Sequence, residues 1–290
     1  MGGEVNDMIL DRRGLLAAGA LLALATAVPS WARASVSPEV IDLTVSAKRS
    51  TKLCIWRPRK VRGVAIFSTG QGSWPERYAP LLIDLLTKNG FAVLSPVHVD
   101  SMHYPDREAF TAQQGFFERV ADMRATSAQA AALFPGKPVI AVGHSYGSLI
   151  ALGLGGALDF VHMRDESVKA VLCFSSPGKI PGLVRPGAFA TLAVPTLLVT
   201  GTNDTVPTFV SDPADHLFPI ESAPPGARYA LVVGGADHVL VATPNSFAHA
   251  RPLVTDFVEA YGLGDRPALA RLAHFTPLAG DRYIDRGKPA

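Results

Sequence analysis

Apolar segments and segments of helical periodicity alternate along most of this chain. Six short runs are almost entirely apolar, as strands are when helices cover both faces of a parallel sheet. These predicted strands are 64–68, 92–97, 139–142, 168–174, 196–200 and 229–233. Two earlier runs, 40–45 and 51–56, are joined by a polar turn and predict an antiparallel hairpin at the start of the sheet.

The segments between these strands predict helices. The expected helices are 75–88, 108–134, 145 to about 158, 246–261 and 267–274, with a loose end after the last of them. Asn89-Gly90 and Pro135-Gly136 supply stop signals for the first two. The Pro- and Gly-rich segment 175–194 predicts a short cap-like excursion. The predicted fold class is therefore α/β, a mostly parallel twisted sheet with helices on both faces and an N-terminal antiparallel hairpin.

Residues 1–34 have the three parts of an export signal. Arg12 and Arg13 precede an apolar stretch, 15–28, and Ala32-Arg33-Ala34 offers a small-x-small cleavage site. The apolar stretch is shorter than the ~20 residues that span a bilayer, so we expect a removed signal, with an uncleaved anchor as the alternative. The arginine pair resembles the twin-arginine type, and a general secretory signal is the alternative. The mature chain, 35–290, is then a single periplasmic or secreted domain without stable membrane insertion.

Charge and cysteine content narrow the possible partners. The chain has 27 basic and 25 acidic residues, a formal net charge of +2, and they are scattered without long runs. This distribution lacks the basic surface that nucleic acid requires, so a small-molecule substrate is expected. The two cysteines, Cys54 and Cys173, lie in apolar strand-like segments. Buried free thiols are therefore expected rather than a disulfide.

A nucleophile motif lies between a predicted strand and a predicted helix. Residues 143–147 read Gly-His-Ser-Tyr-Gly, which is the G-x-S-x-G elbow in its strand-turn-helix context. The elbow holds its serine in a strained backbone position, where larger neighbours would collide with the adjoining elements. Ser145 is therefore the candidate nucleophile.

An acid and a histidine follow the elbow in the order that such a nucleophile requires. Asp204 lies in the loop after the predicted strand 196–200, at the sheet edge where α/β proteins place their chemistry. Asp212 and Asp215 are the alternative acids, and an Asx-turn role is the structural alternative for Asp204.

The candidate general base is His238. It follows the predicted strand 229–233 and a Gly234-Gly235 pair, which allows the loop to turn back toward the elbow. Seven other histidines compete for the role. His144 is adjacent to the nucleophile and is expected to point away from it.

The reaction also needs two donors for the oxyanion of a tetrahedral intermediate. One is expected from the backbone N–H of Tyr146, directly after the nucleophile, and the other from the loop after the first parallel strand. That loop is 69–74, and its glycines allow close approach, so we assign the second N–H to Gln71. The alternative, a phosphate-binding loop, lacks the third glycine of G-x-G-x-x-G and the lysine of a P-loop.

The elbow, acid loop and histidine loop together resemble the α/β-hydrolase superfamily. Within it the chain is most similar to serine carboxylesterases of the dienelactone hydrolase-like and chlorophyllase-like group, which is akin to platelet-activating-factor acetylhydrolases. The similarity spans about 40–272 and includes 67–73 and 95–98. Two features depart from the group: dienelactone hydrolases use a cysteine where this chain has Ser145, and the usual His-Gly of the oxyanion loop is Thr69-Gly70. The resemblance implies the α/β-hydrolase fold and an esterase without a cofactor, but it does not name the substrate.

Residues near the carboxyl ends of the first strands are candidates for the substrate pocket. His98, Asp100 and His103 lack the spacing of an established metal motif, so no metal is predicted and a place at the pocket rim is expected. The other candidate pocket residues are Trp74, Met102 and Tyr146, with ordinary packing as the alternative for each.

The sequence thus predicts a serine hydrolase that cleaves a small-molecule carboxylic ester through an acyl-enzyme. Acyl transfer, or amide and peptide cleavage, with the same three residues is one alternative. A binding protein on this fold without turnover is another, although a pure binder has no need for that ordered set of residues.

Overall fold

The computed structural model describes residues 37–180 and 183–287. The predicted export signal, 1–34, lies outside the described residues, as do two residues of the predicted excursion 175–194. No helix in the described ranges has both the length and the apolar character that a membrane crossing requires.

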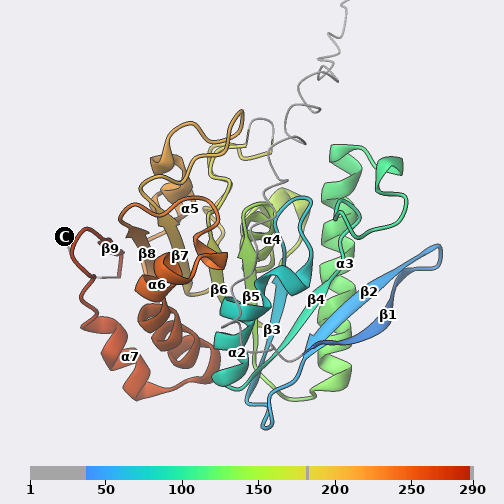
Figure 1. Ribbon diagram of the computed structural model, residues 1–290, viewed down its shortest axis with the longest axis horizontal. Coiled ribbons are helices and arrows are strands. Elements are labelled where there is room, and N and C mark those ends of the chain that lie inside the picture. Colours follow the sequence, from blue (N-terminus) through green and yellow to red (C-terminus); the bar gives the residue numbers. More distant parts are fainter. Residues whose placement is uncertain (1–36, 181–182, 288–290) are drawn as a thin grey trace, which may run out of the picture. The chain divides into compact units, whose positions relative to one another are not determined.

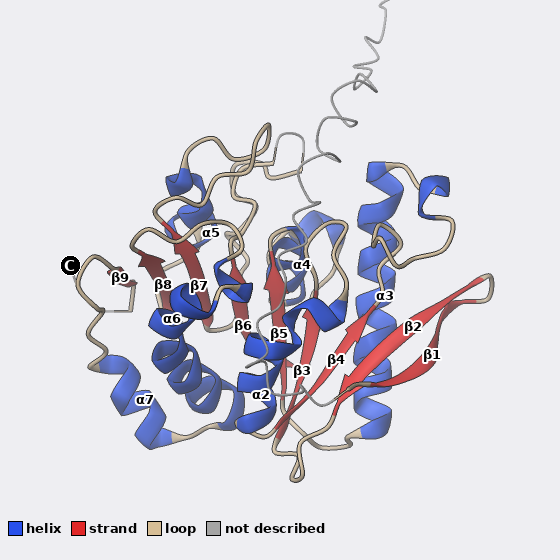
Figure 2. Ribbon diagram, viewed as in Figure 1, coloured by secondary structure: helices blue, strands red, loops and turns tan. Residues whose placement is uncertain are grey.

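The described strands form one mixed sheet of nine (Figures 1 and 2). The strands are β1 (Glu39–Ser46), β2 (Arg49–Trp56), β3 (Gly63–Ser68), β4 (Phe91–Pro96), β5 (Val139–His144), β6 (Val168–Phe174), β7 (Thr196–Gly201), β8 (Arg228–Val233) and β9 (Arg282–Asp285). Their order across the sheet is β1-β2-β4-β3-β5-β6-β7-β8-β9. The strands from β4 to β8 in this order are parallel to one another, whereas β1, β2 and β9 pair antiparallel.

Helices cover both faces of this sheet, and each face has its own apolar core. The α-helices in the described ranges are α2 (Asp84–Lys88), α3 (Ala112–Leu133), α4 (Tyr146–Leu154), α5 (Phe218–Ser222), α6 (Pro244–Phe257) and α7 (Arg266–Ala273). Side chains of α3, α4 and α5 pack in one core, and side chains of α2, α6 and α7 pack in the other. Helices α2 and α6 lie in front of the sheet in Figure 1. The predicted fold class is confirmed, and both cysteines are free and buried as predicted.

The parallel strands direct their carboxyl ends to one edge of the sheet. Residues of β3, β5 and β8 are buried throughout, which explains why these segments are continuously apolar in the sequence. The loops that follow β3, β5, β7 and β8 therefore meet at this edge.

The predicted helix 75–88 is divided into three short helices. It begins as a 3₁₀ turn, Pro75–Tyr78, widens into a π turn, Ala79–Ile83, and ends as α2. Pro80 explains the change, because it has no N–H to donate and its ring conflicts with the carbonyl group four residues earlier. Helix α3 starts later than predicted, at Ala112, where Thr111 and Gln114 form a capping box.

The prediction of a loose C-terminal end is wrong for residues 282–285. These residues form β9, which pairs antiparallel with β8. Without β9, the outer edge of β8 would leave backbone N–H and C=O groups unpaired. The ring of Tyr283 also stacks on the ring of Tyr229, with 6.3 Å between the ring centroids. Four residues are too few to reveal a strand by their alternation alone.

Candidate active site

Ser145 occupies a strained turn between β5 and α4. Its φ of 52° and ψ of −124° are unusual for a residue with a side chain. A Cβ atom at Gly143 would collide with the carbonyl group of Gly147, and one at Gly147 would collide with that of Ser68. Both glycines are thus required for the close approach of strand, turn and helix. The Ser145 side chain stays partly exposed in this position.

The structure brings Ser145, His238 and Asp204 into one hydrogen-bonded chain. The Ser145 Oγ lies 2.9 Å from His238 Nε2, and His238 Nδ1 lies 2.7 Å from Asp204 Oδ1. Asp204 is fully buried, and the His238 side chain is 23% exposed. With Nδ1–H donating to the carboxylate, the lone pair of Nε2 faces the hydroxyl group, as a general base requires.

Asp204 is held as a carboxylate. Burial alone would raise its pKa, but hydrogen bonds from His216 and His238 outweigh burial and hold the pKa well below its usual value. Thr200 donates a further hydrogen bond to Oδ2 at 2.7 Å. The alternative acids have other partners: Asp212 caps the 3₁₀ helix Pro213–Leu217, and Asp215 pairs with Lys179 at 2.5 Å.

The acid loop and the histidine loop are joined by their backbones. Asn203 N–H donates to the Ala236 carbonyl oxygen at 2.9 Å, and Thr202 N–H donates to Val233 at 3.0 Å. A Cβ atom at Gly201 would collide with the Ala236 carbonyl group, so the two loops touch directly. This contact fixes the distance between Asp204 and His238.

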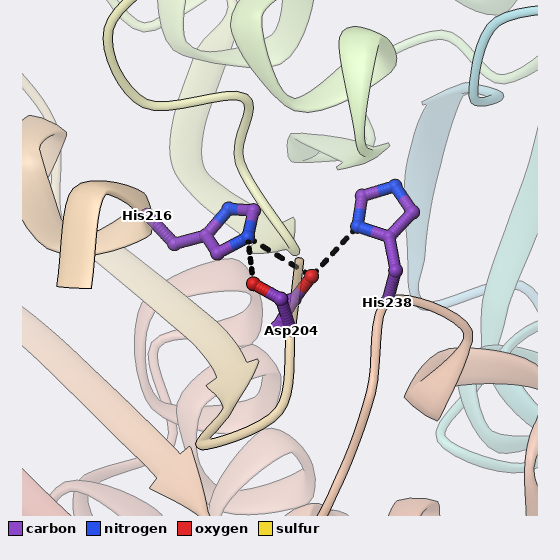
Figure 3. A group of neighbouring side chains, drawn as sticks. All are labelled: Asp204, His216 and His238. Carbon is purple, nitrogen blue, oxygen red and sulfur yellow. Dashed lines mark hydrogen bonds and ion pairs between the residues drawn. The ribbon is translucent and has the colours of Figure 1, made fainter. Parts of the chain in front are cut away.

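A second histidine, His216, binds the same carboxylate. Its Nε2 lies 2.9 Å from Asp204 Oδ1, and Figure 3 shows His216 and His238 on opposite sides of Asp204. His216 is fully buried, and its ring stacks on His238 with 6.0 Å between ring centroids. From the sequence, His216 is only one of the seven histidines that compete with His238. His216 follows Asp204 by twelve residues, where the loop returns to the same strand end, and this spacing was the one indication in the sequence that the two could meet.

Within the described ranges, Asp204, His216 and His238 also have potential ligand atoms close enough together to hold a metal ion. The atoms lie within 4.8 Å of one another. Both imidazole rings, however, already direct a nitrogen at the same carboxylate oxygen. The donor atoms of these three residues are thus already engaged in hydrogen bonds with one another.

His144 supports the histidine loop from inside the molecule. Its Nε2 lies 2.9 Å from the carbonyl oxygen of His238, and its Nδ1 lies 2.9 Å from the Tyr78 hydroxyl group. Burial, together with the nearby His238, lowers the pKa of His144 to about 3. The ring is therefore neutral, donating from Nε2 and accepting at Nδ1. Its contacts are with these two residues and not with the Ser145 hydroxyl group.

The two predicted oxyanion donors are unused by the described part of the chain. Neither the Gln71 N–H nor the Tyr146 N–H donates a hydrogen bond to a described residue. The loop that carries Gln71 lies close to the elbow, since a Cβ atom at Gly70 would lie 3.5 Å from the Cβ of Ser145. Two backbone donors beside a serine hydroxyl are the arrangement that binds an oxyanion.

A buried arginine of α3 braces this loop. Arg119 donates to the carbonyl oxygens of Thr69 at 2.7 Å and Gly70 at 3.1 Å, and it pairs with Asp100 at 2.8 Å. Its guanidinium group also lies over the ring of Tyr146, 5.0 Å from the centroid. Arg119 thus contacts both segments that carry the oxyanion donors. The sequence did not single it out, because its partners are 49 and 50 residues away.

Two of the predicted pocket residues are accessible to solvent: Trp74, at the end of this loop, and Met102, which is hydrogen-bonded to it. Trp74 is partly exposed and stacks on His103, with 4.6 Å between ring centroids. Met102 is 49% exposed, and its backbone N–H donates to the Gly72 carbonyl oxygen at 3.1 Å. A partly exposed aromatic ring and an exposed thioether at the loop that carries Gln71 are suitable to contact an apolar group of a substrate.

His98 does not line a solvent-facing pocket, contrary to the sequence prediction. It is fully buried, with Nε2 2.9 Å from Ser68 Oγ and Nδ1 2.8 Å from Asp122 Oδ2. The prediction took the end of β4 as the pocket edge, but the side chain turns inward to α3. His98 pairs with Asp122 while Asp100 pairs with Arg119, so the two do not form a joint ligand set.

The nine-stranded sheet, its covering helices and the elbow at the end of β5 define the α/β-hydrolase fold. Solved structures share it. A soluble variant of monoglyceride lipase from Saccharomyces cerevisiae superposes with a TM-score of 0.63 at 14% identity, covering 81% of this chain and 99% of that one. A dienelactone hydrolase from Anabaena variabilis superposes with a TM-score of 0.57 at 20% identity, covering 78% and 99%.

A third neighbour, an alpha-beta serine hydrolase homologue from Coxiella burnetii, has a TM-score of 0.56 at 16% identity and covers 77% of this chain and 98% of that one. At these identities the likeness concerns the fold. No protein-family model and no curated protein sequence matches the chain.

Proposed function

We propose that this protein is a serine hydrolase that cleaves small carboxylic esters. The observation that carries the proposal is the hydrogen-bonded chain from Ser145 Oγ through His238 to the buried carboxylate of Asp204. Those three groups, in that order, convert a weakly nucleophilic hydroxyl group into an effective one. The neighbours on the same fold include a monoglyceride lipase and a dienelactone hydrolase, which agrees with a hydrolase.

The reaction has two halves. The Ser145 oxygen attacks the ester carbonyl carbon while His238 Nε2 takes the serine proton. The bond from the carbonyl carbon to the leaving oxygen then breaks, and His238 passes the proton to the departing alcohol. In the second half His238 takes a proton from water, the hydroxide formed attacks the acyl carbon, and Ser145 regains its proton as the acid leaves.

The oxyanion of each tetrahedral intermediate would be bound by Gln71 N–H and Tyr146 N–H. Neither N–H donates to another residue in the described ranges, and Arg119 fixes the loop around Gln71. Removing one such donor typically lowers kcat by ~10²–10³. A rigid pair of donors therefore accounts for a large part of the expected rate.

Labelling with a fluorophosphonate separates this proposal from a binding protein on the same fold. An activated Ser145 forms a covalent adduct whose charge the same groups stabilise, and Ser145→Ala abolishes the labelling. Ser37→Ala, at an exposed serine outside the strands, is the matched control and should label like the wild type. Absence of labelling in a folded wild-type protein would contradict the proposal.

A panel of p-nitrophenyl esters of graded acyl length then identifies the reaction. We expect hydrolysis of short and medium acyl chains, because the segment 175–194 is too short to cover a long lipid groove. Labelling with little hydrolysis until an alcohol is added would indicate an acyltransferase, and cleavage of the matching amides at equal rates would indicate an amidase. Rates that rise steadily with long, aggregated substrates would indicate a lipase instead.

A further inference from the structure

The environment of His216 differs from that of every other histidine in the site. His216 lies on the 3₁₀ helix Pro213–Leu217 and is fully buried. Its Nδ1 contacts the carbonyl oxygen of Ser176. Its Nε2 lies 2.9 Å from the carboxylate of Asp204 and 2.9 Å from the carbonyl oxygen of the same residue. All three partners are acceptors that carry no proton at neutral pH.

A neutral imidazole does not satisfy these contacts. It has one N–H and one lone pair, so one ring nitrogen would point its lone pair at a carbonyl or carboxylate oxygen. The imidazolium form has two N–H donors and satisfies both sides. By contrast, His144 faces a tyrosine hydroxyl group on one side and His238 faces a serine hydroxyl group, and a hydroxyl group can donate to a neutral ring.

Among the three histidines around Asp204, only His216 thus needs two protons. We infer that His216 is a permanent imidazolium paired with the Asp204 carboxylate, and that this pair sets the pH range in which His238 acts as the base. The second half of this inference rests on the proposed function, whereas the charge of His216 does not. His216 touches no reacting atom and is therefore a positioning residue.

The effect on His238 follows from charge sharing. Both imidazole rings bind the same oxygen of Asp204, at 2.9 Å and 2.7 Å, and Asp204 and His216 are fully buried. A positive His216 neutralises much of the carboxylate charge that a protonated His238 would otherwise feel. The positive charge of His216 therefore weakens the attraction between the Asp204 carboxylate and an imidazolium at His238.

Other charged groups around the pair add little net charge. On the helix of His216, Asp215 forms an ion pair with Lys179 at 2.5 Å. His144, which packs against His238 with 5.2 Å between ring centroids, is neutral because burial lowers its pKa. Thr200 contributes an uncharged hydroxyl group to Asp204. The pKa of His216 agrees with this: burial would lower it, but the hydrogen bond and charge of Asp204 raise it above its usual value.

The first test measures the proton count of His216 without reference to activity. The ring nitrogens of the full mature protein, labelled with ¹⁵N-histidine, are observed by NMR from pH 5 to pH 8, and His216→Asn assigns the signals. We expect both His216 nitrogens to keep the protonated pattern throughout this range. A neutral pattern at pH 7, or a titration below pH 6.5, would overturn the inference.

The second test follows the acidic limb of kcat/KM against pH for a soluble p-nitrophenyl ester. His216→Asn keeps a donor but removes the charge, and we expect the limb to move to higher pH by ~1 unit. His216→Lys restores a positive charge and should return the limb toward the wild-type position. A lower kcat with an unmoved limb in His216→Asn would mean that His216 only supports the fold, and the inference on pH would be wrong.

The two proposals fail in distinguishable ways. A protein that neither labels with fluorophosphonate nor cleaves esters contradicts the proposed function, while the NMR pattern of His216 still decides its charge. If His216→Asn does not fold, the NMR spectra of the wild-type protein alone decide the charge of His216. In those spectra the signals of histidines that titrate are separated from the signals of histidines that do not.

Discussion

The hydroxyl group of Tyr78 lies 2.9 Å from Nδ1 of His144, and this contact connects two loops of the site. Tyr78 Oη also accepts a hydrogen bond from the Gly70 N–H at 3.2 Å, and His144 Nε2 donates to the His238 carbonyl oxygen at 2.9 Å. The loop that carries Gln71 and the histidine loop are therefore joined by two buried side chains, those of Tyr78 and His144.

We predict that Tyr78→Phe loosens both loops. The change leaves the Gly70 N–H and His144 Nδ1 without their partner, and a buried unsatisfied group costs about 1–3 kcal/mol. Stability in urea should fall by an amount in this range, with a loss of kcat for ester hydrolysis. Tyr104→Phe, at a partly buried tyrosine outside the connection, serves as the control. Wild-type stability and kcat in Tyr78→Phe would show that the contact has no energetic role.

We predict that Asp204→Asn preserves the fold and lowers kcat by ~10⁴, because the amide favours the wrong tautomer of the base. Asp212→Asn is the matched control, since Asp212 only caps a 3₁₀ helix. Steady-state kinetics on a soluble ester, with circular dichroism to verify folding, measure both variants. A loss of less than about tenfold would assign the acid role elsewhere.

Arg119→Lys should lower kcat more than it raises KM. Lysine keeps the charge but cannot donate to Thr69, Gly70 and Asp100 at once, as the guanidinium group does. The loop then holds the Gln71 N–H less firmly, and the loss should not exceed the ~10²–10³ expected for a missing oxyanion donor. Arg124→Lys, on the same helix with an exposed hydrogen bond to the His162 carbonyl oxygen, should leave kcat unchanged. Equal losses in the two variants would contradict the bracing role.

The stability of the protein should be greatest near pH 6.5, as far as these two histidines determine it. The pKa of His144 is about 3 in the fold and about 6.5 in the unfolded chain, so the unfolded chain binds an extra proton between these values. Stability should therefore fall as the pH drops below 6.5, by at most ~1.4 kcal/mol per pH unit. The raised pKa of His216 has the opposite sign: its contribution is complete below pH 6.5 and is lost progressively as the pH rises from 6.5 to the folded value, because the folded protein keeps a proton that the unfolded chain has released.

Urea denaturation at pH 5, 6.5 and 8 checks both signs. His144→Asn should flatten the acidic side of the profile, and His216→Asn should flatten the alkaline side. If His144→Asn declines as steeply as the wild type between pH 6.5 and pH 5, the assignment of that window to His144 is wrong.

Export is a separate proposal, on residues that lie outside the described structure. The joint change Arg12→Lys and Arg13→Lys should prevent release of the mature protein if the signal is of the twin-arginine type, because that pathway reads the arginine pair and not charge alone. Cell fractionation with an antibody to the mature chain measures the outcome. Normal periplasmic amounts of the double variant would indicate the general secretory route.

Features that depend on neighbouring residues or on chain order could be predicted from the sequence. The elbow was recognisable because the glycines at 143 and 147 are required by contacts within a few residues of Ser145 and with one adjacent strand. Asp204 and His238 were identified by chain order and by their places after strands. The parallel sheet followed from its continuously apolar strands.

The remaining features depend on which side chains meet in three dimensions. Arg119 and Tyr78 reach the site from helices whose orientation no local pattern reveals. His98 was assigned to the pocket because of its place after a strand, although the direction of a side chain in a loop is set by its partners, here Ser68 and Asp122. His216 was overlooked because a lone histidine in a short 3₁₀ helix carries no periodic signal.

The contacts of His98 have a consequence for recognising active sites by shape. Ser68, His98 and Asp122 repeat the atom order and spacing of Ser145, His238 and Asp204, with 2.9 Å and 2.8 Å in place of 2.9 Å and 2.7 Å. A search of coordinates for serine, histidine and aspartate at these distances returns both sets. Ser68 is fully buried on a regular strand, whereas Ser145 is partly exposed at a strained turn. Access for a substrate and backbone geometry, rather than hydrogen-bond lengths, are what distinguish the proposed nucleophile Ser145 from Ser68, whose hydroxyl group forms hydrogen bonds only with His98 and Arg119 among the described residues.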